Sequence, residues 1–591
     1  MKGTVMLKIL AKSIREYKGK SILTPILVAF EVVMECFIPF TAADLIESIR
    51  EGCGLDTILK YGIALTVMAV ISLIFGALAG RTCATASTGF AKNLRHDLFH
   101  RVQEFSFENI DRFSTSSLVT RLTTDVANVQ LAYMMIIRTA IRSPFMLVFS
   151  LFMAFYMGGP MALVFVLVIP ILGGGLFLVA RLVMPLFRRV FRKYDRLNES
   201  IEENVAGMRV VKSFVREEHE KDKFDAAAKT VCLDFTKAEK ILAFNAPLMQ
   251  LCMYGVMIFV MYFGSRTIIS TVPADGAVAS FGVGQMSALL TYGAQILFSL
   301  MILSMLLVMI TLSYESAKRI TEVLTEESTI KNPEAPVFKI ENGDITFKNV
   351  RFRYGGASTD ALTDINLHIA SGETVGILGG TGSSKTTLVQ LISRLYDVSE
   401  GELLVGGHNV KEYDLDSLRG EVSVVLQKNL LFSGTIKENL RWGNPNATDE
   451  ELIAACRMAQ ADEFVRSFPN GYDTYIEQGG TNVSGGQKQR LCIARALLKT
   501  PKVLILDDST SAVDTKTDAQ IRRAFREYIP ETTKIIIAQR VSSVMDADKI
   551  VMMDDGKITA IGTHQELLSS SDIYREIYES QSKGKEESDE V

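Results

Sequence analysis

The chain has 591 residues, of which 48% are hydrophobic, and a mean hydropathy of +0.21. This length predicts several domains, and the net charge of -4 gives no indication of a nucleic-acid partner. Seven cysteines are scattered singly, with no CxxC pair and no cluster of histidines, which argues against a disulfide framework or a zinc site.

Six long apolar segments in the first 315 residues predict an all-α membrane domain. Each segment exceeds or approaches the roughly 20 residues that cross about 30 Å of hydrocarbon. Backbone groups in lipid must bond internally, so each segment is expected to be a helix. The segments are 21–46, 58–80, 134–157, 161–184, 241–263 and 283–312.

Basic residues predict the orientation of these segments. Six lysines and arginines lie within the first 20 residues, five within 89–129 and thirteen within 186–240. The connections 49–57, 158–160 and 264–282 carry only Arg50 and Arg266. By the positive-inside rule, both termini are expected in the cytoplasm.

Four charged residues lie inside the predicted spans, where a charge is costly. Glu31 and Glu35 are four residues apart on one face of the first span, and Arg138 and Arg142 are four apart on the third. One interpretation is mutual pairing that holds two helices together. The other is a substrate cavity, in which the carboxylates face a cationic substrate.

Methionines recur every four residues on the last two spans, at 249–261 and at 301–309. Flexible, polarisable methionine side chains suit promiscuous binding surfaces. Helix packing or lipid contact is the simpler interpretation.

The composition changes after the sixth span. Residues Thr325 to Pro336 are polar and charged and include two prolines, as in a domain linker. From Ile340 strand patterns alternate with helical ones, which predicts an α/β fold. We therefore expect a membrane domain at 1–324, a linker at 325–339, an α/β domain at 340–580 and a charged, disordered tail at 581–591.

A phosphate-binding loop follows the apolar strand Thr374–Leu378 and precedes a helical pattern. In such a loop, backbone N–H groups and a helix N-terminus face the phosphates. Lys385 is expected to reach the β- and γ-phosphates and Thr386 to contact Mg²⁺. Ser384 departs from the pattern, which has glycine there. The expected nucleotide-binding residues of the loop are Gly379, Thr381, Gly382, Ser383, Ser384, Lys385, Thr386 and Thr387.

Further motifs, in order and spacing over residues 340–580, resemble the cassettes of ABC transporters. Tyr354 resembles the aromatic residue that stacks on adenine, and Gln427 the glutamine that touches Mg²⁺. The segment 503–508 resembles the strand that ends in the Mg²⁺-binding aspartate, here Asp507, and Ser511–Asp514 resembles the loop that follows. The family signature is matched by Ser484, Gly485, Gly486 and Gln487.

This resemblance covers nearly the whole chain, because six spans before one cassette is the layout of an exporter half-transporter. It implies an all-α six-helix membrane domain fused to an α/β P-loop ATP-binding cassette, with ATP and Mg²⁺ as ligands. It also implies that two cassettes meet head to tail, so that Lys385 and Ser484 of one chain serve different ATP molecules. The basic connections, at Ile110–Val126 and Asn204–Phe214, resemble the loops that transmit force to the cassettes. The alternative for them is a solvated helix face.

Two residues depart from the family pattern at catalytic positions. Asp508 stands where the family has a glutamate that activates water, and it is one methylene shorter. Gln539 stands where a histidine usually holds the γ-phosphate, and glutamine cannot carry charge. One interpretation is drift, with Asp508 still active in a smaller site. The other is that the chain resembles the degenerate subunit of a heterodimeric exporter, because its catalytic residues are altered while its signature is intact.

The resulting hypothesis is an ATP-driven exporter subunit for drugs, lipids or peptides, in the plasma membrane of a bacterium. Its expected catalytic residues are Asp508, Gln539, Gln427 and Asp514, and its expected partners are a second, non-identical half-transporter, the bilayer and a small-molecule substrate. The alternatives are an ATP-binding regulatory subunit without its own transport cycle and an importer with an exporter fold.

Overall fold

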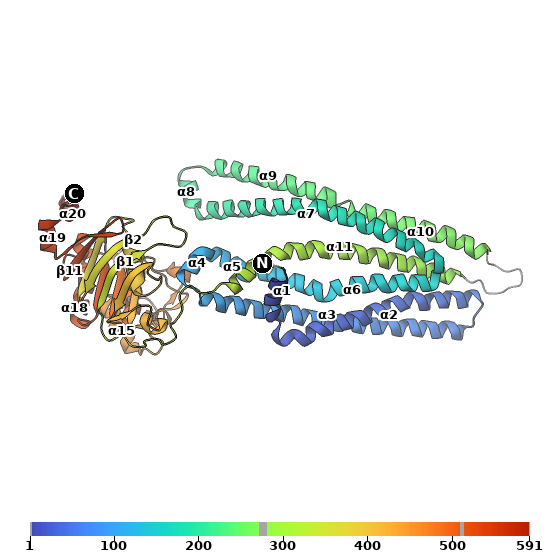
Figure 1. Ribbon diagram of the computed structural model, residues 1–591, viewed down its shortest axis with the longest axis horizontal. Coiled ribbons are helices and arrows are strands. Elements are labelled where there is room, and N and C mark those ends of the chain that lie inside the picture. Colours follow the sequence, from blue (N-terminus) through green and yellow to red (C-terminus); the bar gives the residue numbers. More distant parts are fainter. Residues whose placement is uncertain (1–2, 271–280, 509–512, 590–591) are drawn as a thin grey trace. The chain divides into compact units, whose positions relative to one another are not determined.

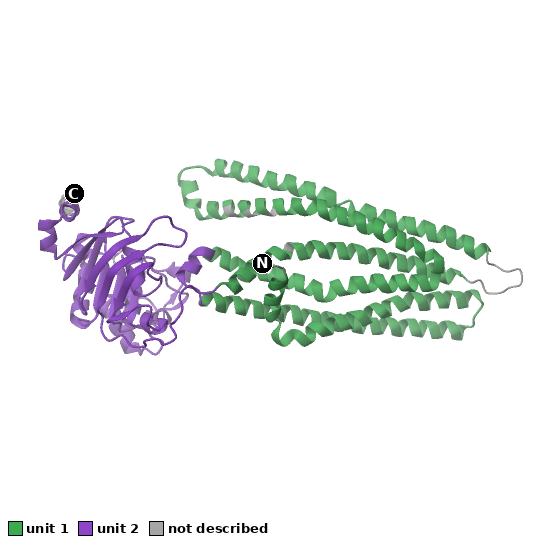
Figure 2. Ribbon diagram, viewed as in Figure 1, with its two compact units in different colours: residues 1–103, 115–326 green, residues 104–114, 327–591 purple. Residues whose placement is uncertain are grey.

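The computed structural model describes residues 3–270, 281–508 and 513–589. The chain forms two compact units (Figure 2). The first, here called the helical unit, comprises residues 1–103 and 115–326, and the second, the α/β unit, comprises residues 104–114 and 327–591. Residues 104–114 thus belong to the α/β unit although more than 200 residues of the helical unit follow them in sequence. The expected membrane domain, 1–324, includes these residues, whereas the resemblance of the connection from Ile110 to a force-transmitting loop implies contact with the cassette.

The helical unit contains long helices that run through the predicted spans (Figure 1). Its α-helices are α1 (Gly3–Lys12), α2 (Lys18–Arg50), α3 (Leu55–Gln103), α5 (Thr115–Thr120), α6 (Val126–Gly158), α7 (Leu163–Ala206), α8 (Met208–Ser213), α9 (Glu217–Leu242), α10 (Asn245–Ser270) and α11 (Val283–Thr325).

Five helical runs among the described residues are long and apolar enough to cross a membrane. One of them, Thr115–Ala206, turns at the 3₁₀ helix η3 (Gly159–Ala162) and so contains two of the six expected spans. The expected span 241–263 differs slightly, because the helix is interrupted at Ala243 and Phe244 and α10 begins at Asn245. The connection 264–282 lies partly outside the described residues.

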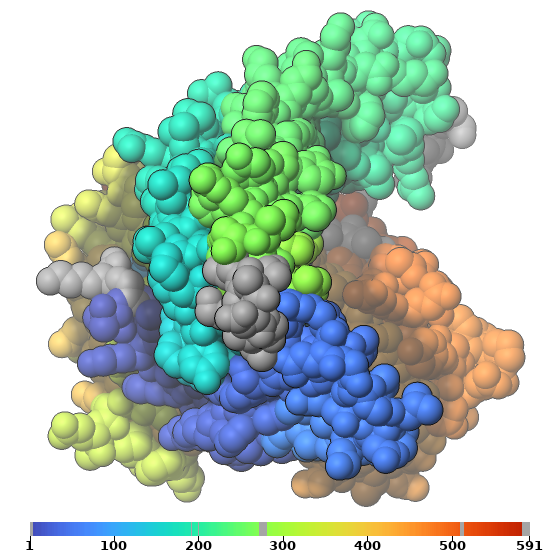
Figure 3. Space-filling model, turned by 90° about the vertical axis from the view of Figure 1, so that its right-hand side faces the viewer, coloured from blue at the N-terminus to red at the C-terminus, as the bar shows by residue number. Residues whose placement is uncertain are grey.

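Helix α11 joins the other long helices of this unit. Helices α2, α3 and α6 contact one another, α7 contacts α9 and α10, and α11 contacts α2 and α6 as well as α7 and α10. Figure 3 looks onto one end of the unit, where α7 in teal lies beside α10 in green and where α2 and α3 lie in blue. Apolar side chains from α2, α6, α7, α10 and α11 form a shared core around the fully buried Tyr292 and Phe165.

An ion pair joins α2 to α6 inside the apolar part of the unit. Arg142 Nη1 lies 2.6 Å from Glu31 Oε1, and Arg142 Nη2 donates to both carboxylate oxygens of Glu35 at 2.8 Å. Glu31 is buried, and its Oε2 has no hydrogen-bond partner among the described residues. Arg138 makes no ion pair among them. The geometry therefore supports the pairing interpretation for three of the four charged residues, and the substrate-cavity interpretation stays a prediction.

The α/β unit is built on two main sheets. The six-stranded sheet has the order β12-β11-β3-β10-β9-β6, and the four-stranded sheet has the order β2-β1-β4-β5. The strands are β1 (Ile345–Phe352), β2 (Leu362–Ile369), β3 (Thr374–Gly379), β4 (Glu400–Val405), β5 (His408–Asn409), β6 (Val422–Val425), β7 (Gly434–Thr435), β8 (Tyr475–Ile476), β9 (Val503–Asp507), β10 (Thr533–Ile537), β11 (Lys549–Asp554) and β12 (Lys557–Gly562).

Parallel pairing in the six-stranded sheet brings several expected site residues to one edge. Strand β10 pairs in parallel with β3 and β9, and Ile537 lies opposite both Ile377 and Asp507. Strands β9 and β10 are buried along their whole length, as expected for parallel strands covered on both faces. The carboxyl ends of these strands form the usual ligand-binding edge of an open α/β sheet.

Helices cover the sheets and divide the apolar interior into two clusters. One cluster lies between the two sheets and includes side chains of α12 and α13, and the other joins the helices from α14 to α20 to the opposite face of the large sheet. The helices are α4 (Phe107–Phe113), α12 (Lys385–Ile392), α13 (Leu415–Glu421), α14 (Ile436–Leu440), α15 (Asp449–Met458), α16 (Asp462–Ser467), α17 (Gly485–Leu497), α18 (Thr515–Tyr528), α19 (His564–Ser570) and α20 (Asp572–Asp589).

The tail differs from the expectation. Residues 581–591 were expected to be disordered, but α20 continues to Asp589. The start of this helix is fixed by the fully buried Tyr574, and extending an existing helix adds one hydrogen bond per residue without a new nucleation cost. The extension contains no proline, and Gly584 is its one residue of low helix propensity.

We predict that Arg142→Gln destabilises the chain by about 2–4 kcal/mol, because it leaves two carboxylates in an apolar region without their cation. Arg138→Gln is the matched control, since it makes the same change one helical turn earlier on α6. Thermal unfolding in detergent, followed through the helical signal, compares the two variants. Equal midpoints would contradict a role for the ion pair as a brace.

Candidate functional site

The phosphate loop leads from β3 into α12, and two of its glycines are required by the backbone. A Cβ atom at Gly379 would collide with the carbonyl oxygen of Met553 on the neighbouring strand. Gly382 has a φ of +88°, in the left-handed region that side chains rarely adopt. Ser383 closes the loop, because its buried hydroxyl donates to the Gly380 carbonyl at 2.9 Å. Thr381 lies exposed at the tip of the loop.

Ser384 carries a backbone conformation suited to the glycine of the usual pattern. Its φ is +65° and its ψ is 24°, so it is left-handed, and it stands directly before α12 as the N-cap residue. Its side chain makes no capping hydrogen bond. For a residue with a Cβ atom, this left-handed conformation costs roughly 1–2 kcal/mol.

The Lys385 ammonium folds over the loop. Its Nζ donates to the carbonyl oxygens of Gly379 at 3.0 Å and Gly380 at 2.6 Å and to Ser383 Oγ at 3.1 Å. Burial lowers the pKa of Lys385, and the nearby carboxylates of Asp507 and Asp508 oppose this shift. A positive group held at the N-terminus of α12 is suited to an anionic ligand.

Thr386 and Asp507 connect α12 to the end of β9. Thr386 Oγ1 donates to Asp507 Oδ1 at 3.0 Å, and Asp507 is only 2% exposed. Burial raises the pKa of Asp507, and the Thr386 hydrogen bond opposes this shift. Among the described residues, no group of three His, Cys, Asp or Glu side chains could hold a metal alone. A hydroxyl beside one carboxylate still fits Mg²⁺, which prefers few protein oxygens together with substrate phosphates.

The two residues that depart from the family pattern, Asp508 and Gln539, contact each other directly. Gln539 Nε2 donates to Asp508 Oδ2 at 2.9 Å. Asp508 follows β9 with a φ of +47°, and its backbone N–H donates to the Ile537 carbonyl on β10 at 3.1 Å. Left-handed backbone at a non-glycine residue is often found at functional sites. The amide of Gln539 thus occupies one oxygen of the short carboxylate.

Tyr354 lies against the phosphate-loop helix. Its hydroxyl and Thr387 Oγ1 are 2.9 Å apart, so one donates to the other. Its ring is perpendicular to that of Tyr396, with centroids 5.3 Å apart. The structure therefore brings this expected adenine-contacting residue to the loop, in contact with a second tyrosine.

Tyr396 also holds α4, which sequence reasoning did not predict. Its hydroxyl donates to Asp111 Oδ2 at 2.6 Å, and its ring centroid is 6.1 Å from that of Phe107. Asn109 on α4 donates to the Glu327 carbonyl at 3.3 Å. Burial raises the pKa of Tyr396, with the Asp111 carboxylate adding to the shift. Tyr396 lies four residues beyond the end of α12, where no sequence motif marks it as a partner of α4.

The signature residues form the beginning of α17. Ser484 Oγ accepts from the Gln487 N–H at 3.4 Å, and Gln487 Oε1 accepts from the Ser484 N–H at 2.9 Å, which is a capping box. Gly485 and Gly486 are the first two residues of the 13-residue helix. Helices α17 and α12 pack in different apolar clusters, and no interaction joins these signature residues to Lys385 among the described residues.

The remaining expected site residues lie near strand and helix ends. Gln427 is exposed, two residues beyond β6, whose Val425 pairs with Leu506. Asp514 caps α18 by accepting from the Thr517 N–H at 2.9 Å, and this backbone hydrogen bond lowers the pKa of Asp514. Ser511 and Ala512 lie outside the described residues.

We predict that Ser384→Gly stabilises the α/β unit by about 0.5–1 kcal/mol, because relief of the left-handed strain exceeds the added entropy of the unfolded chain. Thermal unfolding of the whole chain measures the effect. Ser358→Gly is the control, because Ser358 is exposed and has no positive φ. An equal gain in both variants would show that strain at Ser384 is not its cause.

We predict that Tyr396→Phe loosens α4, because it removes a hydrogen bond to a carboxylate worth about 1.5–3 kcal/mol. Amide hydrogen exchange in residues 104–114 should become faster. Tyr413→Phe is the matched control, since the Tyr413 hydroxyl donates to the Val405 carbonyl at 2.7 Å within the same unit. Equal protection of α4 in all three proteins would contradict the prediction.

Comparison with family models gives two matches on this chain. Residues 21–300 match the ABC transporter transmembrane region, and residues 362–511 match the ABC transporter model for the ATP-binding domain.

Curated relatives match along most of their length. An uncharacterized ABC transporter ATP-binding protein, YfiB of Bacillus subtilis, is 35% identical over 94% of this chain and 95% of its own. A probable multidrug resistance ABC transporter ATP-binding/permease protein of the same organism, YheI, is 33% identical over 83% of each chain. An ATP-dependent lipid A-core flippase of Desulfotalea psychrophila is 31% identical over 83% of this chain and 84% of its own.

A solved structure has the same fold over nearly the whole chain. A bacterial Atm1-family ABC exporter with ATP bound superposes with a TM-score of 0.79, covering 96% of this chain and 98% of that one, at 23% identity. The predicted fold class, an all-α membrane domain fused to an α/β ATP-binding cassette, is thereby confirmed. With its membrane region, its cassette and relatives above 30% identity over most of its length, this chain belongs to the ABC transporter family, as a multi-pass membrane protein with an exporter-type half-transporter fold.

Proposed function

We propose that this chain is the ATP-binding but weakly hydrolysing half of a heterodimeric exporter. The observation that carries the proposal is the contact between Gln539 and Asp508, at the place where the family has a histidine and a glutamate. The comparisons support the coarser function, a transporter of the ABC exporter type coupled to ATP hydrolysis.

In this proposal the phosphate loop binds ATP. Lys385 exchanges its carbonyl partners for β- and γ-phosphate oxygens, and the loop N–H groups cradle the same phosphates. Tyr354 supplies an aromatic face for adenine. Mg²⁺, held by Thr386 and Asp507 with Gln427 near by, would neutralise phosphate charge when bound.

Asp508 is poorly suited to activate water. A general base must lie within about 3 Å of the proton it takes, directly or through one water. The Asp508 side chain is one methylene too short for the family geometry, and Gln539 holds one of its oxygens at 2.9 Å. Gln539 can donate a hydrogen bond to a γ-phosphate but adds no positive charge.

A second chain is expected to complete the assembly. The capping box at Ser484 and Gln487 is intact, so α17 can present its N-terminus to an ATP molecule held by the partner. Helix α8 and the residues after it expose apolar side chains, with Val210, Phe214 and Val215 each 60–80% exposed. Such a surface fits coverage by another protein chain, and the weakness of its own site indicates that the partner is not an identical copy.

The transported substrate is proposed as an amphipathic small molecule, such as a drug, lipid or peptide. The names of the multidrug and lipid A-core relatives support this class of compound. Arg142 occupies Glu31 and Glu35, which leaves Arg138, half-buried on α6, as the charge available to a substrate among the four. We place the chain in a bacterial plasma membrane with both termini cytoplasmic.

We predict that Asp508→Glu raises the ATPase rate of the purified chain by about 10²-fold, because a base in the correct position contributes 10²- to 10⁴-fold. Phosphate release from the chain in lipid nanodiscs measures the rate. Asp572→Glu makes the same chemical change at an exposed position and should leave the rate unchanged.

A second variant tests whether the chain works with a non-identical partner. Lys385→Ala in the coexpressed pair should lower ATP binding at this chain's loop while the site completed by Ser484 still turns over. Rapid hydrolysis by the unaltered chain alone, at the rate of Asp508→Glu, would exclude the heterodimer proposal. If the coexpressed pair transported its substrate equally with and without ATP, the proposal of an ATP-driven exporter would be excluded.

A further inference from the structure

The segment that carries Gln539 is held by helices on two sides. Residues 539–546, here called the switch segment, follow β10 and include the short helix η6 (Val541–Ser543). Gln539 is exposed at the start of this segment, whereas Val541 is 2% exposed. The conformation of Gln539 therefore depends on what fixes the main chain on either side of it.

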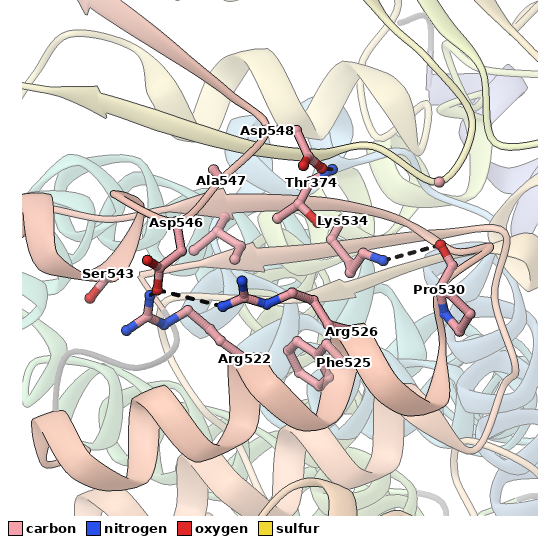
Figure 4. Close-up of a pocket in the computed structure, with 12 residues that line it drawn as sticks. Thr374, Arg522, Phe525, Arg526, Pro530, Lys534, Ser543, Asp546, Ala547 and Asp548 are labelled. Carbon is pink, nitrogen blue, oxygen red and sulfur yellow. Dashed lines mark hydrogen bonds and ion pairs between the residues drawn. The ribbon is translucent and has the colours of Figure 1, made fainter. Parts of the chain in front are cut away.

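Helix α18 holds the far end of the switch segment. Ser543 Oγ donates to Asp518 Oδ2 at 3.2 Å, and both residues are buried. Arg522 Nη1 donates to Asp546 Oδ2 at 3.0 Å, as Figure 4 shows together with Ser543. These contacts bind the segment from Ser543 onward, but none of them reaches Gln539.

Helix α20 holds the near end through one side chain. Gln581 Nε2 donates to the Gln539 carbonyl at 2.9 Å, and Gln581 Oε1 accepts from the Val541 N–H at 2.9 Å. The fully buried Tyr574, with partly buried Ile577 and Tyr578, anchors α20 in the same apolar cluster as Val541 and Val544. The amide of Gln581 thus bridges the residue before and the residue after Arg540.

We propose that Gln581 is a positioning residue for the ATP site, which fixes Gln539 in the orientation that meets Asp508. Gln581 is not among the residues expected to bind nucleotide or metal, and its side chain contacts the main chain of the switch segment. It holds the carbonyl of Gln539, whose own side chain donates to Asp508 at 2.9 Å. This inference rests on the proposed function, because it assigns a task to the same γ-phosphate side of the nucleotide site.

Two hydrogen bonds from one amide make this role chemically specific. Loss of the side chain leaves the buried Val541 N–H without its partner and frees the Gln539 carbonyl to rotate toward water. Loss of the donor alone, as in Gln581→Glu, keeps the Val541 contact but places a carboxylate oxygen against the Gln539 carbonyl. The two variants therefore separate anchoring of the segment from orientation of Gln539.

The test compares MgATP and MgADP binding, because Gln539 faces the site of the γ-phosphate that only ATP carries. Equilibrium binding to the full chain in lipid nanodiscs measures both affinities for the unaltered chain, Gln581→Ala and Gln581→Glu. The preference for ATP over ADP should fall by about fivefold in both variants, the loss expected from about one hydrogen bond. Gln565→Ala, an exposed glutamine on neighbouring α19, is the matched control and should keep the preference.

Hydrogen exchange gives an independent readout. Peptides covering residues 537–545 should exchange faster in Gln581→Ala, whereas Gln581→Glu should retain protection of the Val541 amide. An unchanged ATP preference in Gln581→Ala, or an equal loss of ATP and ADP affinity, would overturn the positioning role. Those results leave the proposed function intact, whereas an unaltered chain that binds no ATP overturns the proposed function and this inference with it.

Discussion

The hydrogen bond between Thr386 and Asp507 is the contact on which the geometry of the site depends. It joins the first turn of α12 to the last residue of the fully buried strand β9. Because β3, β9 and β10 are parallel and in register, the same hydrogen bond fixes the position of the phosphate loop relative to Asp508 and Gln539. A buried carboxylate with a raised pKa is costly unless it is partnered, which ties the strand to the loop.

A second set of contacts brings residues from far apart in the sequence to the same loop. Asp111 contacts Tyr396, the ring of Tyr396 supports Tyr354, and Tyr354 meets Thr387 on α12. Each contact is ordinary in strength, but together they form a continuous path from α4 to the phosphate loop. A displacement of α4 would therefore change the surroundings of the Tyr354 ring, without any change in the loop sequence.

Sequence patterns predicted the parts of this protein that depend on local chemistry. Apolar length predicted the membrane helices, and the spacing of the loop Gly379–Thr387 placed Lys385 and Thr386 on one helix end, as the structure has them. The pairing of Tyr396 with Asp111 spans 285 residues and leaves no local pattern. The sequence also does not predict which of two similar residues forms an ion pair. Nothing in it shows that Arg142 rather than Arg138 binds both glutamates.

The positions of Asp508 and Gln539 bear on the proposed function, in which the chain hydrolyses ATP weakly at its own site and keeps its signature for another. Asp508 and Gln539 lie at the ends of adjacent strands, and each is the other's hydrogen-bond partner, so a change in one alters the environment of the other. A neutral amide satisfies a short carboxylate without the charge that a histidine brings to a γ-phosphate. Ser484 lies on α17, in a different apolar cluster from the loop helix, and its capping box involves neither residue. The residues proposed to weaken hydrolysis at this chain's own site are therefore structurally separate from the signature residues proposed to serve another site.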